Sequence, residues 1–231
     1  MLVARFEDES ILVVEKPAGM HTAPLRPGET GTLLSLVIEA WPEVARVPGI
    51  KPVEPGLLHR LDRDTSGLVV VARTAAAFEA LRADFDSMRK EYVAVCRAGA
   101  ESMSGFSITS RFAPYGPGRR RVRVVATGAD RFPRSTTREE YATKVSVLAC
   151  SEGRVLVRAA LTRGFRHQVR AHLAFAGLPI IGDSLYGEPV PRGFEPRMFL
   201  HAALIALRHP VTGLPLVVES PAPLSFAALV R

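Results

Sequence analysis

The hydrophobic and polar positions of the chain follow two periods, and these predict strands and helices in separate blocks. Two short apolar runs, Ile11–Lys16 and Gly67–Arg73, are rich in β-branched residues and predict buried strands. Between them, apolar residues recur at helical spacing after Thr32, and Pro42 ends this predicted helix. Residues 44–56 contain three prolines and two glycines, so they predict a loop.

A second helix is predicted after Thr74, because threonine caps helix N-termini well. Its apolar stripe ends at Met88, and two cations, Arg89 and Lys90, would lie at its C-terminus, where they favour the helix dipole. The following segment, Glu91–Arg97, alternates in character and predicts another strand.

The middle of the chain predicts successive strands joined by turns, which is typical of an antiparallel sheet. These strands are Phe106–Phe112, Arg119–Ala126, Glu139–Ala149 and Arg154–Leu161. A helix with apolar positions from Val169 to Ala176 follows, and His201–Leu207 with Leu214–Glu219 predict a closing hairpin. We therefore expect an α+β fold with a mixed, largely antiparallel sheet, helices packed on it, and one domain over residues 1–231.

The composition is that of an ordinary globular protein, with 47% hydrophobic and 23% charged residues in 231. This balance excludes disordered, collagen-like and coiled-coil classes. The formal net charge is +7, and only four of the 30 basic residues are lysines, so arginine supplies 26 (30 − 4). A surplus of arginine favours a polyanionic partner, because its planar fork matches phosphate. A soluble basic protein with an arginine-rich composition remains the alternative.

Two further features bear on location. The longest apolar runs are far shorter than the roughly 20 residues that cross a membrane, and the acidic N-terminus does not resemble a signal peptide. Two cysteines, Cys96 and Cys150, are too few for a disulfide framework. We therefore expect a cytoplasmic protein without a membrane partner, and Cys96 as a small buried hydrophobic residue.

The densest polar cluster is the segment HRLDRDTSG, His59–Gly67, which lies between the proline-rich loop and a predicted buried strand. Asp62 and Asp64 are flanked by arginines, which favour an ionised carboxylate, and this suits a nucleophile better than a general acid. The alternative is a turn in which these polar side chains bind backbone donors.

A second cluster, Arg163–His172, leads into the predicted third helix. His167 and Arg170 are three residues apart and share a helix face. His167 and His172 are five apart, which disfavours a zinc pair, and no CxxC motif is present. We therefore predict no metal site.

The segment HRLDRDTSGLVVVA resembles the signature of the RluA-type pseudouridine synthases, which isomerise uridine in RNA. Four other segments resemble motifs of this family in the same order, so that the resemblance spans residues 6–224. They are ILVVEKPAGM, RKEYVAV, FRHQVRAHLAFAGLPIIGDSLYG and FLHAALIALRHPVTGLPLVVESPAP. The resemblance implies a curved sheet crossed by a catalytic cleft. Because it begins almost at Met1, we expect no N-terminal RNA-binding domain of the kind that many relatives carry.

The resemblance also implies roles for individual residues. Asp62 matches the essential aspartate, Tyr92 the aromatic residue that stacks on the target base, and Arg170 the basic residue that pairs with the aspartate. Arg60 matches a residue that fills the space left by a flipped base, and His59 belongs to the same motif.

These roles fit the chemistry of uridine isomerisation, which needs no cofactor because no atoms or electrons are gained or lost. The aspartate could add to C1′ or to the uracil ring, or could abstract a proton from the 2′ carbon. An enclosed pocket would hold the detached uracil and strengthen the pair between Asp62 and Arg170. Extruding the base costs a few kcal/mol.

Several other basic residues are candidates for RNA binding. Arg119, Arg121 and Arg123 would share one face of a strand and could follow phosphates, although a solvated face is the alternative. Arg166 and His167 belong to the third motif, where most relatives have Gly-Arg-Thr or Gly-Arg-Ser in place of the segment Gly164–Arg166. This departure puts contacts made at Phe165 in doubt.

Two rival functions can be stated, together with what the sequence leaves open. A glycoside hydrolase would need a second acid about 5–9 Å from Asp62, and no companion motif supplies one. If the chain were a non-catalytic RNA-binding module or chaperone, we would expect Asp62, Tyr92 or Arg170 to be replaced, and all three are present. We expect a monomer acting on ribosomal or transfer RNA, and we expect Asp183 and Tyr186 to fix a turn.

Overall fold

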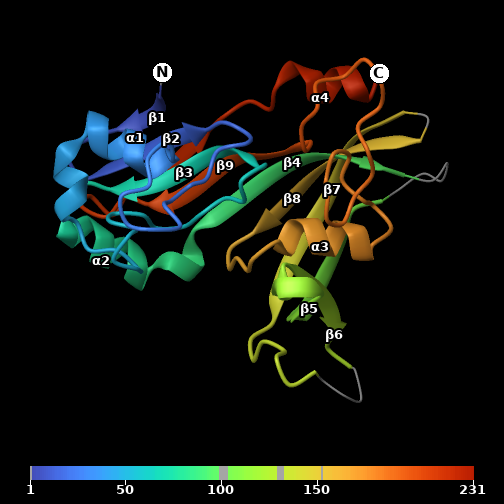
Figure 1. Cartoon of the computed structure of the whole chain (residues 1–231), viewed down its shortest axis with the longest axis horizontal. Coiled ribbons are helices and arrows are strands. Elements are labelled where there is room, and N and C mark those ends of the chain that lie inside the picture. Colours follow the sequence, from blue (N-terminus) through green and yellow to red (C-terminus); the bar gives the residue numbers. More distant parts are fainter. Residues whose placement is uncertain (1, 99–103, 129–132, 152) are drawn as a thin grey trace. The chain divides into compact units, whose positions relative to one another are not determined.

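The computed structural model describes residues 2–98, 104–128, 133–151 and 153–231. It divides the chain into two compact units (Figure 1). The first comprises Met1–Lys90 and His201–Ala222, and the second comprises Glu91–Leu200 and Pro223–Arg231. Both units combine strands with a few short helices, so the predicted α+β class is confirmed.

The first unit is built on a sheet whose strands come from both ends of the chain. In order across the sheet these are β1 (Val3–Glu7), β2 (Ile11–Lys16), β3 (Ser66–Ala72) and β9 (Leu200–Arg208), with β10 (Pro215–Glu219) also paired to β9. Neighbours are antiparallel except β3 and β9, which pair in parallel at Ser66 and Gly67. The predicted closing hairpin is therefore β9 and β10, whereas β1 was not predicted.

Two helices cover this sheet, and each begins at the predicted threonine. The Thr32 side chain caps α1 (Leu33–Ala40) and the Thr74 side chain caps α2 (Ala75–Ala83), each by accepting a backbone N–H three residues on. A 3₁₀ helix, Pro42–Arg46, follows α1 and covers the first three residues of the predicted loop. Phe78 and Leu81 of α2 pack into the same core as the buried strand β3.

The second helix is shorter than predicted. α2 ends at Ala83, a 3₁₀ turn covers Phe85–Ser87, and Arg89 and Lys90 open strand β4 (Arg89–Arg97) instead of closing the helix. Phe85 and Met88 still pack on the core, because a 3₁₀ turn returns apolar side chains to the same side every three residues. The periodicity therefore continued although the helix did not.

The second unit contains the predicted antiparallel strands. In order across the sheet these are β4, β8 (Arg154–Leu161), β7 (Tyr141–Ser151), β5 (Phe106–Tyr115) and β6 (Arg121–Ala126). The helices are α3 (Gln168–Phe175), which ends before Gly177 as predicted, and α4 (Leu224–Leu229), which was not predicted. Cys96 is fully buried, as predicted, and burial raises the pKa of its thiol.

Strand β6 begins two residues later than predicted, and this moves Arg119 off the strand. Pro117–Arg119 form a 3₁₀ turn in which Gly118 and Arg119 have positive φ angles of 61° and 53°. A left-handed pair cannot continue the pleat of a strand. Arg121 and Arg123 do share the exposed face of β6, with Val122 buried between them, but Arg119 lies in the turn.

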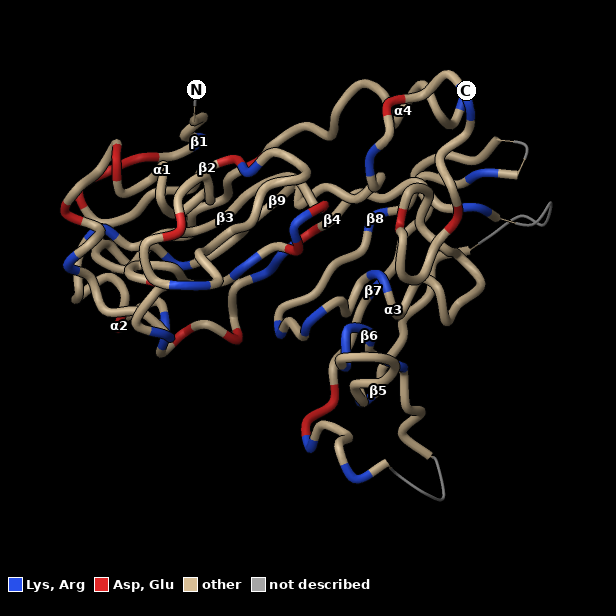
Figure 2. Tube along the Cα trace, in the orientation of Figure 1, with Lys and Arg blue, Asp and Glu red and all other residues tan. Residues whose placement is uncertain are grey.

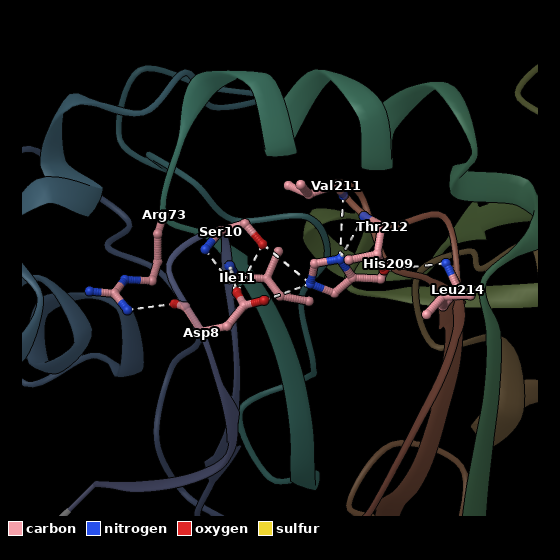
Figure 3. Close-up of polar contacts among 8 residues, drawn as sticks. All are labelled: Asp8, Ser10, Ile11, Arg73, His209, Val211, Thr212 and Leu214. Atoms are coloured by element: carbon pink, nitrogen blue, oxygen red, sulfur yellow. Dashed lines mark hydrogen bonds and ion pairs between the residues drawn. The ribbon is translucent and has the colours of Figure 1, made fainter.

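A buried histidine in the C-terminal segment of the first unit binds the N-terminal segment of the same unit (Figure 3). The Nδ1 atom of His209 accepts the N–H groups of Val211 and Thr212, so Nε2 carries the proton and donates to Asp8 Oδ2 at 2.6 Å. Asp8 and Ser10 both contact Nε2, which is not the linear order of a catalytic triad. The group therefore joins the β1–β2 turn to the β9–β10 turn.

We expect Asp8→Ala to lower the free energy of unfolding by about 2 kcal/mol at pH 7, since the carboxylate accepts hydrogen bonds from Ser10, Ile11 and His209. Burial opposes ionisation, but these bonds lower the pKa of Asp8 to about 2, below its value of 3.8 in an unfolded chain. The stabilisation is complete above the unfolded value and is lost as the pH falls through about 2.

Denaturant unfolding of wild type and Asp8→Ala between pH 7 and pH 2 measures the difference in their free energies of unfolding. This difference should become smaller only at the acid end of the range. Glu9→Ala, at the exposed neighbouring position, is the control and should match wild type. A difference that stays constant with pH would contradict the assignment.

Candidate active site

Asp62 lies in a loop whose backbone is held on both sides. On the N-terminal side, the Thr22 hydroxyl accepts the N–H of Leu61 at 3.1 Å and donates to the Leu61 carbonyl at 2.8 Å. Both groups are buried, so this one hydroxyl satisfies the backbone of the residue before Asp62. On the C-terminal side, the N–H of Thr65 donates to the Asp62 carbonyl and closes a turn.

The ammonium group of Lys16 holds the far side of the same turn. Lys16 is fully buried and donates hydrogen bonds to the carbonyls of Pro17, Met20 and Arg63 at 2.8–2.9 Å. Gly19 and Arg63 add two reciprocal bonds between the same segments. A buried charge is tolerated only when such bonds replace its hydration, and here they attach the loop of Asp62 to the end of β2.

The other predicted residues of this motif have distinct surroundings. Nε2 of His59 accepts the N–H of Val70 at 3.1 Å, and desolvation, with the nearby charge of Lys90, lowers the pKa of His59 to about 3. His59 is therefore neutral and anchors the loop to β3. The Arg60 guanidinium pairs with the buried carboxylate of Glu54 at 2.9 Å while about half of its side chain stays exposed.

A buried hydrogen-bonded chain lies just beyond the loop. Ser66 Oγ is 2.9 Å from Nδ1 of His201, whose Nε2 contacts the carbonyl and hydroxyl of Ser220. Gly67 has φ = 115°, and a Cβ there would overlap the backbone of Ala202. The close parallel approach of β3 to β9 therefore requires glycine at this position.

In the second unit, Arg170 is held by an aspartate that the sequence assigned only to a turn. Its Nε and Nη2 atoms each donate to a carboxylate oxygen of Asp183 at 2.7 Å, and both side chains are almost fully buried. Burial alone would raise the pKa of Asp183, but the bonds from Arg170 lower it below its usual value. Asp183 also accepts the N–H groups of Leu185 and Tyr186, so the predicted turn is confirmed.

The residues before Arg170 connect α3 to the β5–β6 hairpin. His167 has a left-handed backbone conformation with φ = 57°, and its Nδ1 lies 3.0 Å from the Tyr186 hydroxyl. Arg166 is exposed, and its Nη2 donates to the Arg119 carbonyl at 2.7 Å. The predicted RNA-binding residues Arg119, Arg166 and His167 therefore lie in one hydrogen-bonded region.

Phe165, which departs from the family pattern, is an aromatic packing residue. Its ring stacks on Phe112 with centroids 5.1 Å apart, and Tyr141 and His172 complete the cluster. Tyr92, on β4, packs partly buried against the second unit's main core. The structure thus gives Phe165 a role in packing, whereas the partly exposed ring of Tyr92 is compatible with stacking on a base.

The structure groups the predicted site residues by unit. His59, Arg60 and Asp62 belong to the first unit, and the remaining predicted residues belong to the second. These are Tyr92, Arg119, Arg121, Arg166, His167 and Arg170. The predicted pairing of Asp62 with Arg170 involves one residue from each unit and stays a prediction.

Within the described ranges, no group of three or more histidine, cysteine, aspartate or glutamate side chains could hold a metal ion. No helix over the same residues is long and apolar enough to cross a membrane.

Comparison with known proteins places these residues in a family. The family model described as RNA pseudouridylate synthase matches residues 10–175, a range that includes Asp62, Tyr92 and Arg170. The chain belongs to this family. Ribosomal large subunit pseudouridine synthase D of Pseudomonas aeruginosa is 33% identical over 96% of the chain, and that of Xylella fastidiosa is 33% identical over 94%. The chain spans 68% and 65% of these two relatives.

Two other similarities agree with this membership. An uncharacterised RNA pseudouridine synthase of Bacillus subtilis is 32% identical over 98% of the chain and is covered to 71% of its length. Among solved structures, human RNA Pseudouridylate Synthase Domain Containing 1 matches 96% of the chain and 84% of its own, with a TM-score of 0.72 at 24% identity. At that identity the structural match supports the fold alone, and it confirms the predicted pseudouridine synthase-like α+β fold with a mixed sheet.

The structure adds residues that sequence reasoning missed. Thr22 supports the loop of Asp62 from outside every quoted motif. His201 and Ser220 lie within the quoted closing motif, but the sequence assigned neither of them a role. A lone threonine carries no signal in a single sequence. Its role depends on where the loop at residue 61 returns, which is a tertiary property.

We expect Thr22→Val to destabilise the fold by about 2 kcal/mol, because the isosteric side chain leaves the buried N–H and carbonyl of Leu61 unsatisfied. Denaturant unfolding and amide exchange at Leu61 report this change, and exchange should accelerate there. Thr109→Val, on an exposed position of β5, is the control and should stay within about 0.5 kcal/mol of wild type. Unchanged exchange at Leu61 would contradict the role of Thr22.

Proposed function

We propose that this chain isomerises uridine to pseudouridine in RNA, with Asp62 as the catalytic carboxylate. The bond between N1 and C1′ breaks and a bond between C5 and C1′ forms, while C5 loses a proton and N1 gains one. Atoms and electrons balance, so the reaction needs no cofactor or metal. The family membership supports this activity.

The observation that carries the proposal is the rigid mounting of Asp62. The hydroxyl of Thr22 fixes the residue before it, and the ammonium of Lys16 fixes the residue after it. A group that must meet a reacting atom within a fraction of an ångström gains rate from such pre-organisation. A merely solvated turn needs no buried lysine beneath it.

Tyr92 and Arg170 complete the proposed chemistry. We propose that the ring of Tyr92 stacks on the target base and holds the detached uracil, and that the guanidinium of Arg170 pairs with the Asp62 carboxylate. The bonds to Asp183 fix the plane of this guanidinium, so that its orientation toward a second carboxylate is set in advance.

RNA is proposed to follow the exposed basic positions of the two units. In the second unit these are Arg121 and Arg123 on β6, together with Arg119 in the preceding turn and Arg166, which contacts the Arg119 carbonyl. Figure 2 shows in blue the lysine and arginine positions along both units. Arg60, half exposed, is proposed to fill the space of the flipped base. His59 and His167 would support binding mainly by fixing their segments, because each already holds a hydrogen bond.

The names of the relatives favour ribosomal RNA of the large subunit as the substrate, ahead of transfer RNA. We further propose that the enzyme acts as a monomer in the cytoplasm. The second candidate, an RNA-binding module without activity, shares the same basic surface but assigns no purpose to Asp62.

We expect Asp62→Asn to abolish pseudouridine formation in large-subunit ribosomal RNA while RNA binding persists. Chemical mapping of pseudouridine in cells with the gene, without it, and with Asp62→Asn measures the first effect, and filter binding measures the second. Asp64→Asn, in the same turn, is the control and should retain activity. If no site is lost in either the deletion or Asp62→Asn, the enzyme assignment is wrong and the binding module stands.

We expect Arg121→Ser with Arg123→Ser to weaken RNA binding uniformly across sequences. Each lost phosphate contact should reduce the slope of log K against log salt by roughly 0.7 to 0.9. Arg82→Ser, which removes an exposed arginine at the end of α2, is the matched control and should leave the slope unchanged. Equal slopes for the double variant and wild type would exclude β6 from the RNA path.

A further inference from the structure

Arg170 is surrounded by a network that the proposed chemistry does not itself require. Asp183 binds two edges of its guanidinium at 2.7 Å, and the ring of Tyr186 lies beneath it with the centroid 5.3 Å away. One residue therefore fixes the plane of the guanidinium through its edges, and the other fixes it through a face. Together they leave the group little freedom to rotate.

The hydroxyl of Tyr186 connects this arginine to strand β6. It accepts the N–H of Val122 at 2.6 Å and forms a second hydrogen bond with Nδ1 of His167 at 3.0 Å. Val122 is buried between Arg121 and Arg123, so the position of its backbone determines the backbone positions of both exposed arginines. The His167 and Tyr186 rings also form a T-shaped contact, with centroids 5.7 Å apart.

His167 has a left-handed backbone conformation, which few residues other than glycine adopt. Its φ is 57°, and such a conformation persists where surrounding contacts impose it. The hydrogen bond and ring contact with Tyr186 are contacts of this kind. They fix the start of α3, and Arg170 lies one helical turn further along.

We infer that Asp183 and Tyr186 are positioning residues: Asp183 and the Tyr186 ring set the orientation of Arg170, and the Tyr186 hydroxyl ties α3 to the arginine-bearing strand β6. One side chain then determines both the geometry of the catalytic-motif arginine and the place of the RNA-binding strand. The inference rests on the proposed function for its kinetic part, whereas its structural part can be measured without activity.

The ring and the hydroxyl of Tyr186 can be tested separately. Tyr186→Phe removes only the hydroxyl, so the Val122 amide should exchange at least about fivefold faster. The KM for RNA should rise several-fold, while kcat stays within about twofold because the ring beneath Arg170 remains. Tyr186→Leu removes the ring as well, and kcat should then also fall.

Asp183→Asn tests the other half of the inference. Loss of the charged bidentate pair should lower kcat on the order of 100-fold at an unchanged KM, because Arg170 is misoriented while the RNA surface is intact. The rate of each variant is divided by the concentration of folded protein, which calorimetry measures. If this variant is recovered unfolded, Tyr186→Leu supplies the kcat test, since it keeps the ion pair.

Tyr115→Phe, on β5 of the same hairpin, is the matched control and should change neither amide exchange nor kinetics. The inference is overturned if Val122 exchange is unchanged in Tyr186→Phe, or if kcat per folded molecule is unchanged in Asp183→Asn and in Tyr186→Leu. A wild-type protein that forms no pseudouridine would instead refute the proposed function, and the exchange result would still decide the link to β6.

Discussion

The ammonium group of Lys16 is a full charge with no exposure to solvent, and the arrangement of the first unit follows from satisfying it. Three backbone carbonyls accept its hydrogen bonds, and one of them, that of Arg63, belongs to the loop of Asp62. A buried charge without such partners would cost several kcal/mol, so the loop can leave this position only at a high price in free energy. The hydrogen bonds of Lys16 therefore hold the turn that carries the Asp62 carboxylate in one position.

The second unit solves a similar problem with an ion pair. Arg170 and Asp183 are both buried, and their two short hydrogen bonds, together with the Tyr186 ring, replace the water that each charge has lost. Strong pairing of this kind contributes orientation more reliably than stability, because desolvation offsets much of the attraction. In both units, therefore, buried charge fixes the geometry of residues in the catalytic motifs.

The aromatic cluster around Phe165 holds the loop that leads into α3. The Phe165 ring stacks on Phe112, and the neighbouring Arg166 contacts the Arg119 carbonyl. The Gln168 side chain accepts the Phe165 N–H and donates to β7, so the backbone entering α3 is anchored. Aromatic packing and these hydrogen bonds therefore hold the turn together.

The sequence by itself determined the strands other than β1, the helix starts after Thr32 and Thr74, the hairpin of β9 and β10 and the motif around Asp62. Periodicity, capping and turn chemistry are local, so one sequence suffices to read them. The predicted second helix is longer than α2, because the 3₁₀ turn after it keeps apolar residues at a similar spacing. Arg119 was predicted on a strand, because the hydrophobic pattern does not report the left-handed backbone of Gly118 and Arg119. Only the tertiary structure decided which distant groups hold the site: Thr22 on Leu61, Asp183 on Arg170 and Tyr186 on Val122. These partners are distant in sequence and meet only because the fold brings their segments together. Buried donors and acceptors must be paired, so the groups that lie next to one another in the folded chain form the hydrogen bonds.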